Sequence, residues 1–371
     1  MILLSKSCIG EAEKKAVLGV LDREFLGMGE EVRQFEQELS AFFGRPAVCV
    51  VNGTAALQLA LQASGIGKRD EVLVQSLTYV ASFQAISAIG AKPVACDVDP
   101  ETLCLDWKDA EKRLTPKTKA VMPVHYSGGV GTLDEIYAFA EKHSLRVIED
   151  AAHAFGTVYQ GKKVGGFGDI ACFSFDGIKN ITSGEGGCIV TDDEEVLDIV
   201  RDTRLLGVEK DTEQRYSGKR SWQFDVKQQG WRYHMSNIMA AIGSEQLKRF
   251  PEIVVKRRTL AKHYDSLFSN HVQIQPLARD YETVVPHIYV VRIKGMNNLT
   301  VLQAGLSKKG IQTGRNYKPN HWLSLYSNEQ EASLPVTEDV FSELLSLPMH
   351  PNLLEGEIEF IVDSLLNFLK Y

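Results

Sequence analysis

Short apolar runs alternate with helical patterns along the first half of the chain. The runs predict buried strands over 47–51, 71–75, 93–97, 120–124 and 145–150. Apolar side chains at helical spacing predict helices between them, for example over 133–143. This alternation is typical of a mostly parallel sheet with helices on both faces, in which ligands bind beyond the carboxyl ends of the strands. We therefore expect the turns after strands 47–51, 71–75, 120–124 and 145–149 to converge on one crevice.

The pattern changes in the second half. Residues 206–230 are polar and lack periodicity, and a long loop of this kind usually serves a site or a subunit contact. Helices are predicted over 238–248 and 252–268, and short strands and helices follow them, among them a helix over 338–345. We predict an α/β domain over 1–245, with an N-terminal helical segment, and a smaller α+β domain over 246–371. The length of 371 residues also favours two domains.

Composition narrows the possible functions. The formal net charge of -7 argues against a nucleic-acid surface. We find no run of 18 apolar residues and no basic-then-apolar leader, so we expect a soluble protein of the cytoplasm that does not enter a membrane. The six cysteines form neither a C-x-x-C pair nor a Cys/His cluster with zinc spacing, so we expect no metal site. The glycine patterns at 65–69 and 128–131 match neither the phosphate loop nor the dinucleotide fingerprint, which argues against a P-loop NTPase and against NAD binding.

The segment Ser174–Gly187 lies between two further apolar runs, 169–173 and 188–191. It holds one lysine, Lys179, and ends in a cluster of glycines. A lysine that is held in place and desolvated between buried strands has a lowered pKa and suits Schiff-base chemistry. A lysine in a loop is more often a solvated surface charge, so Lys179 needs support from other parts of the chain.

Other turns of the expected crevice carry functional groups. The sequence Asn52–Ala56 joins a strand to a helix, where free backbone N–H groups and the helix dipole attract an anion. Asp150 ends the strand 145–150, and Tyr79 follows another strand. Each of the two residues could instead have a purely structural role, because Asp150 is also suited to cap a helix and Tyr79 to pack in the core.

Pyridoxal phosphate requires this combination of groups. Its phosphate needs backbone N–H groups and a hydroxyl, its pyridine nitrogen a buried carboxylate, its aldehyde a lysine, and its ring an aromatic face. The residues that supply these groups are Gly53, Thr54, Ala55, Tyr79, Asp150 and Lys179. We therefore predict that the protein binds pyridoxal 5'-phosphate.

The sequence resembles the DegT/DnrJ/EryC1/StrS family of sugar aminotransferases, members of the fold-type I class of pyridoxal-phosphate enzymes, along nearly the whole chain. Its most specific motifs are Glu149-Asp150-Ala151-Ala152-His153 and the run from Ser174-Phe175 through Lys179 to Gly184-Glu185-Gly186-Gly187. Further similar segments are Gly27–Gly29, Asn52–Leu57, Val124–Gly128, Tyr233–Ser236, Tyr317–His321 and Leu347–Pro351.

The resemblance implies a role for each matching residue. Lys179 binds the cofactor aldehyde covalently and acts as acid and base, and Asp150 keeps the pyridine nitrogen protonated. The residues implied to bind the cofactor are Gly53, Thr54, Ala55, Tyr79, Asp150, His153, Ser174, Lys179 and Arg232. Those implied to lie near the sugar nucleotide are Tyr317, Lys318 and His321. His153 and His321 are equally suited to structural hydrogen bonds.

Position 232 departs from the family pattern. Many members have Asn there, and that Asn reaches the cofactor phosphate of the neighbouring subunit. Arg232 either makes a stronger phosphate contact through its guanidinium, turns toward a substrate phosphate or the partner chain, or pairs with a surface carboxylate. The family implies a homodimer with active sites at the subunit interface.

The implied reaction moves an amino group from L-glutamate to a nucleotide-linked ketosugar. We expect a dTDP-4-keto-6-deoxyhexose first and the 3-keto isomer second, with the aminosugar used in a surface polysaccharide such as an O-antigen. A sugar 3-dehydratase of the same fold carries histidine in place of the lysine, so Lys179 argues against it. A non-catalytic regulator that kept the fold is the alternative from another class, and the Asp150/Lys179 pair disfavours it.

Overall fold

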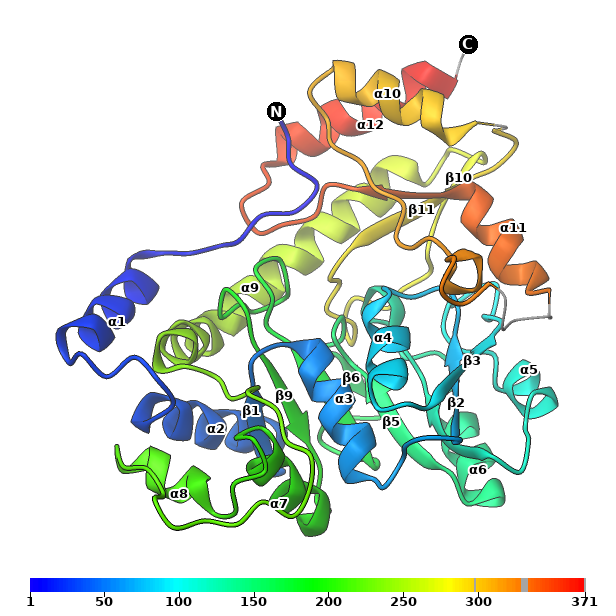
Figure 1. Cartoon of the computed structure of the whole chain (residues 1–371). Helices are drawn as coiled ribbons and strands as arrows, with labels where there is room; N and C mark the ends of the chain where they lie inside the picture. The colour runs from blue at the N-terminus through cyan, green and yellow to red at the C-terminus, as the bar shows by residue number, and fades with distance from the viewer. Residues whose placement is uncertain (297, 328–332, 370–371) are drawn as a thin grey trace.

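A seven-stranded sheet forms the centre of the large domain, in the strand order β1-β9-β8-β5-β4-β2-β3 (Figure 1). The computed structural model describes residues 1–296, 298–327 and 333–369. The strands are β1 (Ala47–Val50), β2 (Glu71–Gln75), β3 (Lys92–Cys96), β4 (Thr118–Met122), β5 (Arg146–Asp150), β8 (Ile170–Ser174) and β9 (Gly187–Val190). Only β9 runs antiparallel to its neighbours β1 and β8. The prediction of a mostly parallel sheet is confirmed.

Helices cover both faces of this sheet, as predicted. The helices α3 (Gly53–Ala63), α4 (Ala81–Ala88) and α7 (Glu194–Thr203) pack on one face, in a core that includes Val72 and Val74. The opposite face carries Leu73 and Val121, which pack against α5 (Trp107–Lys112) and α6 (Leu133–His143). The helix α2 (Glu30–Phe43) covers the same opposite face at β1 and β9. Neighbouring strand residues thus point to opposite cores, because side chains alternate along a strand.

The small domain is built on a three-stranded antiparallel sheet of β10 (Ile274–Pro276), β11 (Tyr289–Ile293) and β12 (Leu344–Leu347). Its helices are α10 (Leu299–Lys308), α11 (Pro335–Glu343) and α12 (Glu355–Leu369). The sequence pattern predicted a helix through residue 345, but the helix ends at Glu343. The segment that follows pairs with β11 and is buried at every position, which favours a strand.

The helix α9 (Asn237–Phe268) connects the two domains, and Figure 1 shows it running from the large sheet up to the small domain. The prediction of two helices, 238–248 and 252–268, was wrong, because Pro251 lies inside one continuous helix. Proline removes one backbone hydrogen bond from a helix. Packing against α1 (Glu11–Asp22), α2 and α12 retains the helix despite that loss.

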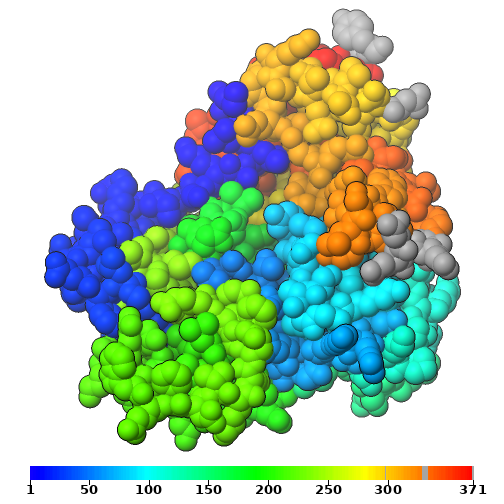
Figure 2. All heavy atoms as spheres, viewed as in Figure 1, coloured from blue at the N-terminus to red at the C-terminus, as the bar shows by residue number. Residues whose placement is uncertain are grey.

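The hydrophobic cores show where the domains meet. The large-domain core includes α9 as far as Ile253, and the small-domain core begins at Leu260. The predicted boundary at residue 245 therefore lies within α9 rather than in a linker. The first residues of the chain lie on the small domain, where Ile2 forms a bridge with Ile311 (Figure 2).

Several shorter elements complete the fold. The predicted loop 206–230 contains a short helix, α8 (Asp211–Tyr216), and β6 (Val158–Tyr159) and β7 (Lys162–Lys163) form a hairpin. All six cysteines are free. Among the described residues, no helix is long and apolar enough to cross a membrane.

Candidate active site

Five strands of the large sheet end at one cavity of 500 Å³. It is lined by residues that follow β1, β2, β4, β5 and β8, together with two residues of the small domain. The lining residues are Asn52, Gly53, Thr54, Leu57, Thr78, Tyr79, Ala81, Val124, Asp150, Ala152, His153, Cys172, Ser174, Asp176, Ile178, Lys179, Glu185, Asn316 and Tyr317. The predicted convergence of strand ends on one crevice is confirmed.

Lys179 lies in the connection between β8 and β9, and its side chain lines the cavity. Burial lowers the pKa of its amine to about 8, although the Asp150 and Asp176 carboxylates act in the opposite direction. Its Nζ lies 3.5 Å from Nε2 of His287. A lysine with a pKa near neutrality has a substantial unprotonated fraction, which a nucleophile requires.

Asp150 ends β5, and the residue is 5% exposed. Ser82 Oγ donates to Oδ2 at 2.7 Å, and the backbone N–H of Ala152 donates to Oδ1 at 3.2 Å. Each carboxylate oxygen keeps a second acceptor position, so the group can also accept a proton donor from the cavity. The bond to Ala152 forms a local turn rather than a helix cap, because no helix begins there.

The first turn of α3 forms an anion cradle with Ser174. The Asn52 side chain caps the helix by accepting the N–H of Ala55 at 2.8 Å. The N–H groups of Gly53 and Thr54 have no carbonyl four residues earlier within the helix, so they stay available. A Cβ at Gly53 would lie 2.8 Å from the Ser174 Cβ, so only glycine allows this close approach. Ala55, also predicted to bind the phosphate, is not among the residues that line the cavity, and its N–H is bonded to the Asn52 side chain.

Aromatic residues form another wall. The ring centroids of Tyr79 and Tyr317 lie 5.5 Å apart, and Tyr79 is 59% exposed, so it is not a core residue. His153 Nδ1 accepts the N–H of Ser127 at 3.4 Å, which leaves the proton on Nε2, 3.1 Å from the Tyr317 hydroxyl. Burial and the charge of Lys179 lower the pKa of His153 well below its usual value. His153 is therefore a neutral ring at the cavity wall.

Besides Ala55, three more predicted residues do not line the cavity. Arg232 and Lys318 are exposed. His321 is buried between Ser76, whose Oγ lies 2.7 Å from Nδ1, and Glu338. His321 therefore makes structural contacts within this chain.

Sequence reasoning missed three residues that shape the cavity. Asn52 is a preferred N-cap residue before a run of small residues, which is a usable sequence signal. Ser82 orients Asp150 from α4, and Thr78 Oγ1 lies 3.1 Å from Ser82 Oγ. His287 reaches Lys179 from the segment before β11, and no sequence pattern connects the two.

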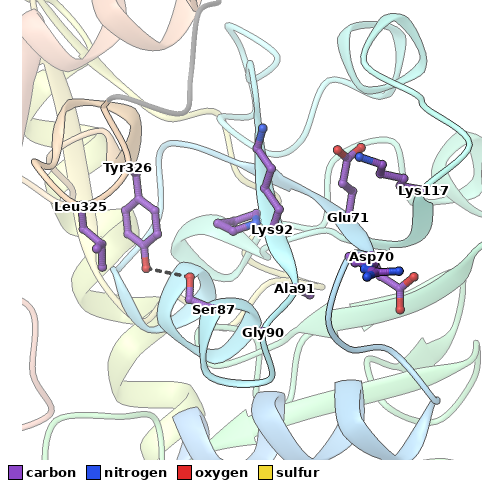
Figure 3. A pocket seen from close by; sticks show the side chains of 11 residues that line it. Asp70, Glu71, Ser87, Gly90, Ala91, Lys92, Lys117, Leu325 and Tyr326 are labelled. Carbon is purple, nitrogen blue, oxygen red and sulfur yellow. Dashed lines mark hydrogen bonds between the residues drawn. The ribbon is translucent and has the colours of Figure 1, made fainter.

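A second cavity, of 530 Å³, lies at the amino ends of β2 and β3 (Figure 3). Its wall includes Glu71, Lys92 and Lys117, and the Tyr326 hydroxyl lies 3.3 Å from Ser87 Oγ. It contains none of the predicted site residues. Ligands of open α/β sheets bind at the carboxyl ends of the strands, so we assign the active site to the cavity that Lys179 and Asp150 line.

Charge in the active-site cavity is mostly negative. Asp150, Asp176 and Glu185 line it, and Lys179 is the one basic side chain among the described lining residues. Burial, with a contribution from Asp176, raises the pKa of Glu185. The described residues contain no cluster of His, Cys, Asp and Glu that could hold a metal ion.

Comparisons with known proteins point to one family. A model of the DegT/DnrJ/EryC1/StrS aminotransferase family matches residues 7–366. The spore coat polysaccharide biosynthesis protein SpsC of Bacillus subtilis (strain 168) is 36% identical over 371 residues, which cover 98% of this chain and 95% of SpsC. The PMP form of the putative sugar aminotransferase Spr1654 from Streptococcus pneumoniae has a TM-score of 0.92 and 31% identity, and 98% of each chain is covered. Helicobacter pylori PseC, an aminotransferase involved in the biosynthesis of pseudoaminic acid, has a TM-score of 0.92 and 30% identity over 100% of both chains.

Pyridoxal phosphate fits the residues of this cavity. Spr1654 has also been solved in its PLP form, and that structure has a TM-score of 0.91 with this chain. Here, the close approach of Gly53 to Ser174 leaves an anion cradle open, and Asp150 and Lys179 line the same cavity. The donor set therefore suits a phosphate, a protonated ring nitrogen and an aldehyde in one ligand.

Proposed function

The chain belongs to the DegT/DnrJ/EryC1/StrS aminotransferase family, and we propose that it transfers an amino group from L-glutamate to a nucleotide-linked ketosugar. It is a pyridoxal-phosphate-dependent aminotransferase, as the family and the solved relatives are. The observation that carries the proposal is the cavity in which Lys179, Asp150 and the Gly53–Ser174 cradle meet.

Each residue of this cavity has a distinct task. When bound, pyridoxal phosphate supplies an aldehyde for amines and a ring that stabilises negative charge beside the transferred amino group. Lys179 supplies an amine that is nucleophilic near neutral pH and that later carries a proton as base and acid. Asp150 would keep a proton on the ring nitrogen of the bound cofactor, and Ser82 holds the Asp150 carboxylate in position. Gly53, Thr54 and Ser174 would hold the phosphate by donating hydrogen bonds to it.

The side walls position and cover the ring. His153 and Tyr317 are joined through the contact of 3.1 Å, and Tyr79 closes the cavity from the solvent side. A neutral His153 avoids a second positive charge beside Lys179, which would compete for the same carboxylates. We place the sugar nucleotide beyond Tyr79 and Tyr317, where the cavity opens.

The proposed substrate class is supported by the descriptions of the similar proteins. We propose a dTDP-4-keto-6-deoxyhexose as substrate, with the 3-keto isomer as second candidate, and an aminosugar product used in a polysaccharide such as an O-antigen. SpsC is named for spore coat polysaccharide biosynthesis, and PseC is described as an aminotransferase in the biosynthesis of pseudoaminic acid, which supports this use. Six free cysteines suit a reducing compartment, and we propose that the reaction takes place in the cytoplasm.

We also propose that a second copy of the chain completes the site. A cofactor phosphate brings negative charge to a cavity in which Lys179 is the only cation among the described lining residues. Arg232 is exposed in its own chain, so its guanidinium is available to a neighbouring molecule. The nearby loop exposes Trp222 by 86% and Phe224 by 57%, and aromatic side chains are enriched in protein interfaces. We assign Arg232 to the cofactor phosphate of the partner subunit.

A product assay tests this function. The purified protein, loaded with pyridoxal phosphate, is incubated with L-glutamate and a panel of dTDP-, UDP- and GDP-ketosugars, and the products are identified by mass spectrometry. We expect an aminosugar from at least one dTDP-ketosugar, with formation of 2-oxoglutarate. If no ketosugar is converted while the cofactor is bound, the proposed substrate class is wrong.

A further inference from the structure

Arg257 is a buried cation that has no carboxylate partner among the residues that the structure describes. It lies on α9, and its side chain is among the largest that are fully buried, with 1% exposure. The guanidinium donates to three backbone carbonyls, those of His287 at 3.1 Å, Pro286 at 3.3 Å and Lys179 at 3.4 Å. No carboxylate acts on its pKa among the described residues, and its Nε has no hydrogen-bond partner there. Burying a charge without a counter-ion is costly, so this arrangement requires a functional explanation.

His287, whose carbonyl Arg257 binds, contacts the amine of Lys179 with its side chain. Its side chain is 2% exposed, and its Nε2 lies 3.5 Å from Nζ of Lys179. The Nδ1 atom is buried and has no partner among the described residues. The ring also packs against His153, with 4.5 Å between the centroids.

The backbone around His287 is tied to both domains. Val285 N donates to Thr157 Oγ1 at 3.1 Å, and the Val285 carbonyl accepts from Asn180 Nδ2 at 3.3 Å. The neighbouring Arg258 donates from Nε to the Val284 carbonyl at 3.1 Å. The segment 284–287 is therefore fixed between the Lys179 loop and the helix that carries Arg257.

We propose that Arg257 and His287 are positioning residues for the amine of Lys179. His287 accepts a hydrogen bond from Nζ at Nε2 and so sets the direction in which the amine points into the cavity. Arg257 holds the backbone carbonyls of Lys179 and His287 at a fixed separation, because one guanidinium binds both. The inference rests on the proposed role of Lys179 as the reactive residue.

Arg257 also acts on Lys179 through its charge. The groups that face the amine are the carboxylates of Asp150 and Asp176, the guanidinium of Arg257, and the neutral rings of His153 and His287. Burial first, and then the charge of Arg257, lower the pKa of Lys179, while both carboxylates raise it. A fixed cation favours the neutral amine, and a neutral acceptor such as His287 favours the ammonium form. Removal of Arg257 should therefore lower the reactivity of the Lys179 amine, and removal of His287 should raise it.

Amine labelling tests the pair. Cofactor-free, full-length protein is treated with acetic anhydride between pH 6 and pH 10, and acetylation of the Lys179 peptide is quantified by mass spectrometry. We expect Arg257→Met to lower the labelling rate at pH 7 by about threefold, which corresponds to a rise of about half a pKa unit. Arg257→Lys keeps a charge and should stay closer to the wild-type rate.

The His287 variants carry the opposite expectation. His287→Leu removes the acceptor and should raise the labelling rate at pH 7 by about threefold. His287→Gln offers an acceptor oxygen at a similar reach and should restore most of the wild-type rate. These variants also keep the inference testable if Arg257→Met does not fold.

The matched control is Arg258→Met, which removes a neighbouring arginine that contacts the same segment but not Lys179. It should leave the labelling profile unchanged. The inference is wrong if Arg257→Met and His287→Leu fold yet shift the labelling in the same direction, or if neither shifts it. Wild-type protein that shows no absorbance band at about 410–420 nm with pyridoxal phosphate would instead contradict the proposed function.

Discussion

Two arginines, Arg204 and Arg257, are both almost completely buried, but their surroundings differ. Arg204 is 0% exposed and donates from Nη1 to Oε1 of Glu36 at 2.5 Å and to the Cys49 carbonyl at 2.6 Å. Burial lowers the pKa of Arg204, but Glu36 and then Tyr216 outweigh that effect and raise it overall. Among the described residues, the guanidinium of Arg257 donates hydrogen bonds only to backbone carbonyls, and burial lowers its pKa to about 10.

The surroundings of the two arginines indicate that the charge of Arg204 has a structural role and that the charge of Arg257 has a functional one. Arg204, Glu36 and Tyr216 form a buried cluster that joins α2, β1 and the loop that contains α8. None of these three residues lines the active-site cavity. Arg257 lies beside the catalytic lysine, where a carboxylate partner would cancel its effect on the amine. We expect changes near Arg204 to affect stability and changes near Arg257 and Lys179 to affect activity, and four substitutions test this division.

Lys179→Ala should have the largest effect. We expect activity to fall by about 10⁴-fold or more, because the nucleophile and the base are removed together. Stability should stay the same or increase, since a desolvated amine is removed from the cavity. Steady-state kinetics and urea unfolding measure the two effects, and a folded variant with near wild-type activity would contradict the role of Lys179.

Glu36→Gln should act on stability. Its removal leaves the Arg204 charge buried without a counter-ion, and we expect a loss of about 3–5 kcal/mol in the free energy of unfolding. The matched control is Glu30→Gln, whose partner Arg33 lies 2.6 Å away in an exposed ion pair that should contribute less than about 1 kcal/mol. Equal losses in the two variants would show that the buried cluster has no special structural role.

Asp150→Asn should reduce activity by about 100-fold or more, because a neutral amide no longer holds a proton on the cofactor nitrogen. It should also lower the pKa of Lys179 below about 8, since the Asp150 charge now raises it. Ser82→Ala keeps the carboxylate and should cause a smaller loss. Activity of Asp150→Asn within tenfold of wild type would contradict the assignment.

Gly53→Ala should give the smallest effect, about a tenfold loss of affinity for pyridoxal phosphate. The added Cβ would lie 2.8 Å from the Ser174 Cβ, so the phosphate cradle must widen. Gly27→Ala is the control, because a Cβ there meets nothing within 4 Å. Fluorescence titration with the cofactor measures both, and equal affinities would place the phosphate elsewhere.

The sequence predicted the large domain well because strand and helix periods are local properties. Helix 133–143 and strand 71–75 were predicted to the residue, and the strand ends converge as expected. Pro251 misled the prediction, since tertiary packing retains the helix around it. The contact between His287 and Lys179 joins residues 108 positions apart, and no local pattern encodes such a distance. The capping bond from the N–H of Ala55 to Asn52 is different, because Asn at a strand-to-helix junction is a local signal that the sequence does carry.

The most direct test of the central claim is the identity of the lysine that binds the cofactor. The protein is loaded with pyridoxal phosphate, reduced with borohydride and digested, and the labelled peptide is sequenced by mass spectrometry. We predict a single phosphopyridoxyl group on Lys179 in the wild type and none in Lys179→Ala. A label on another lysine, or no label on a protein that has bound the cofactor, would contradict the proposed active site.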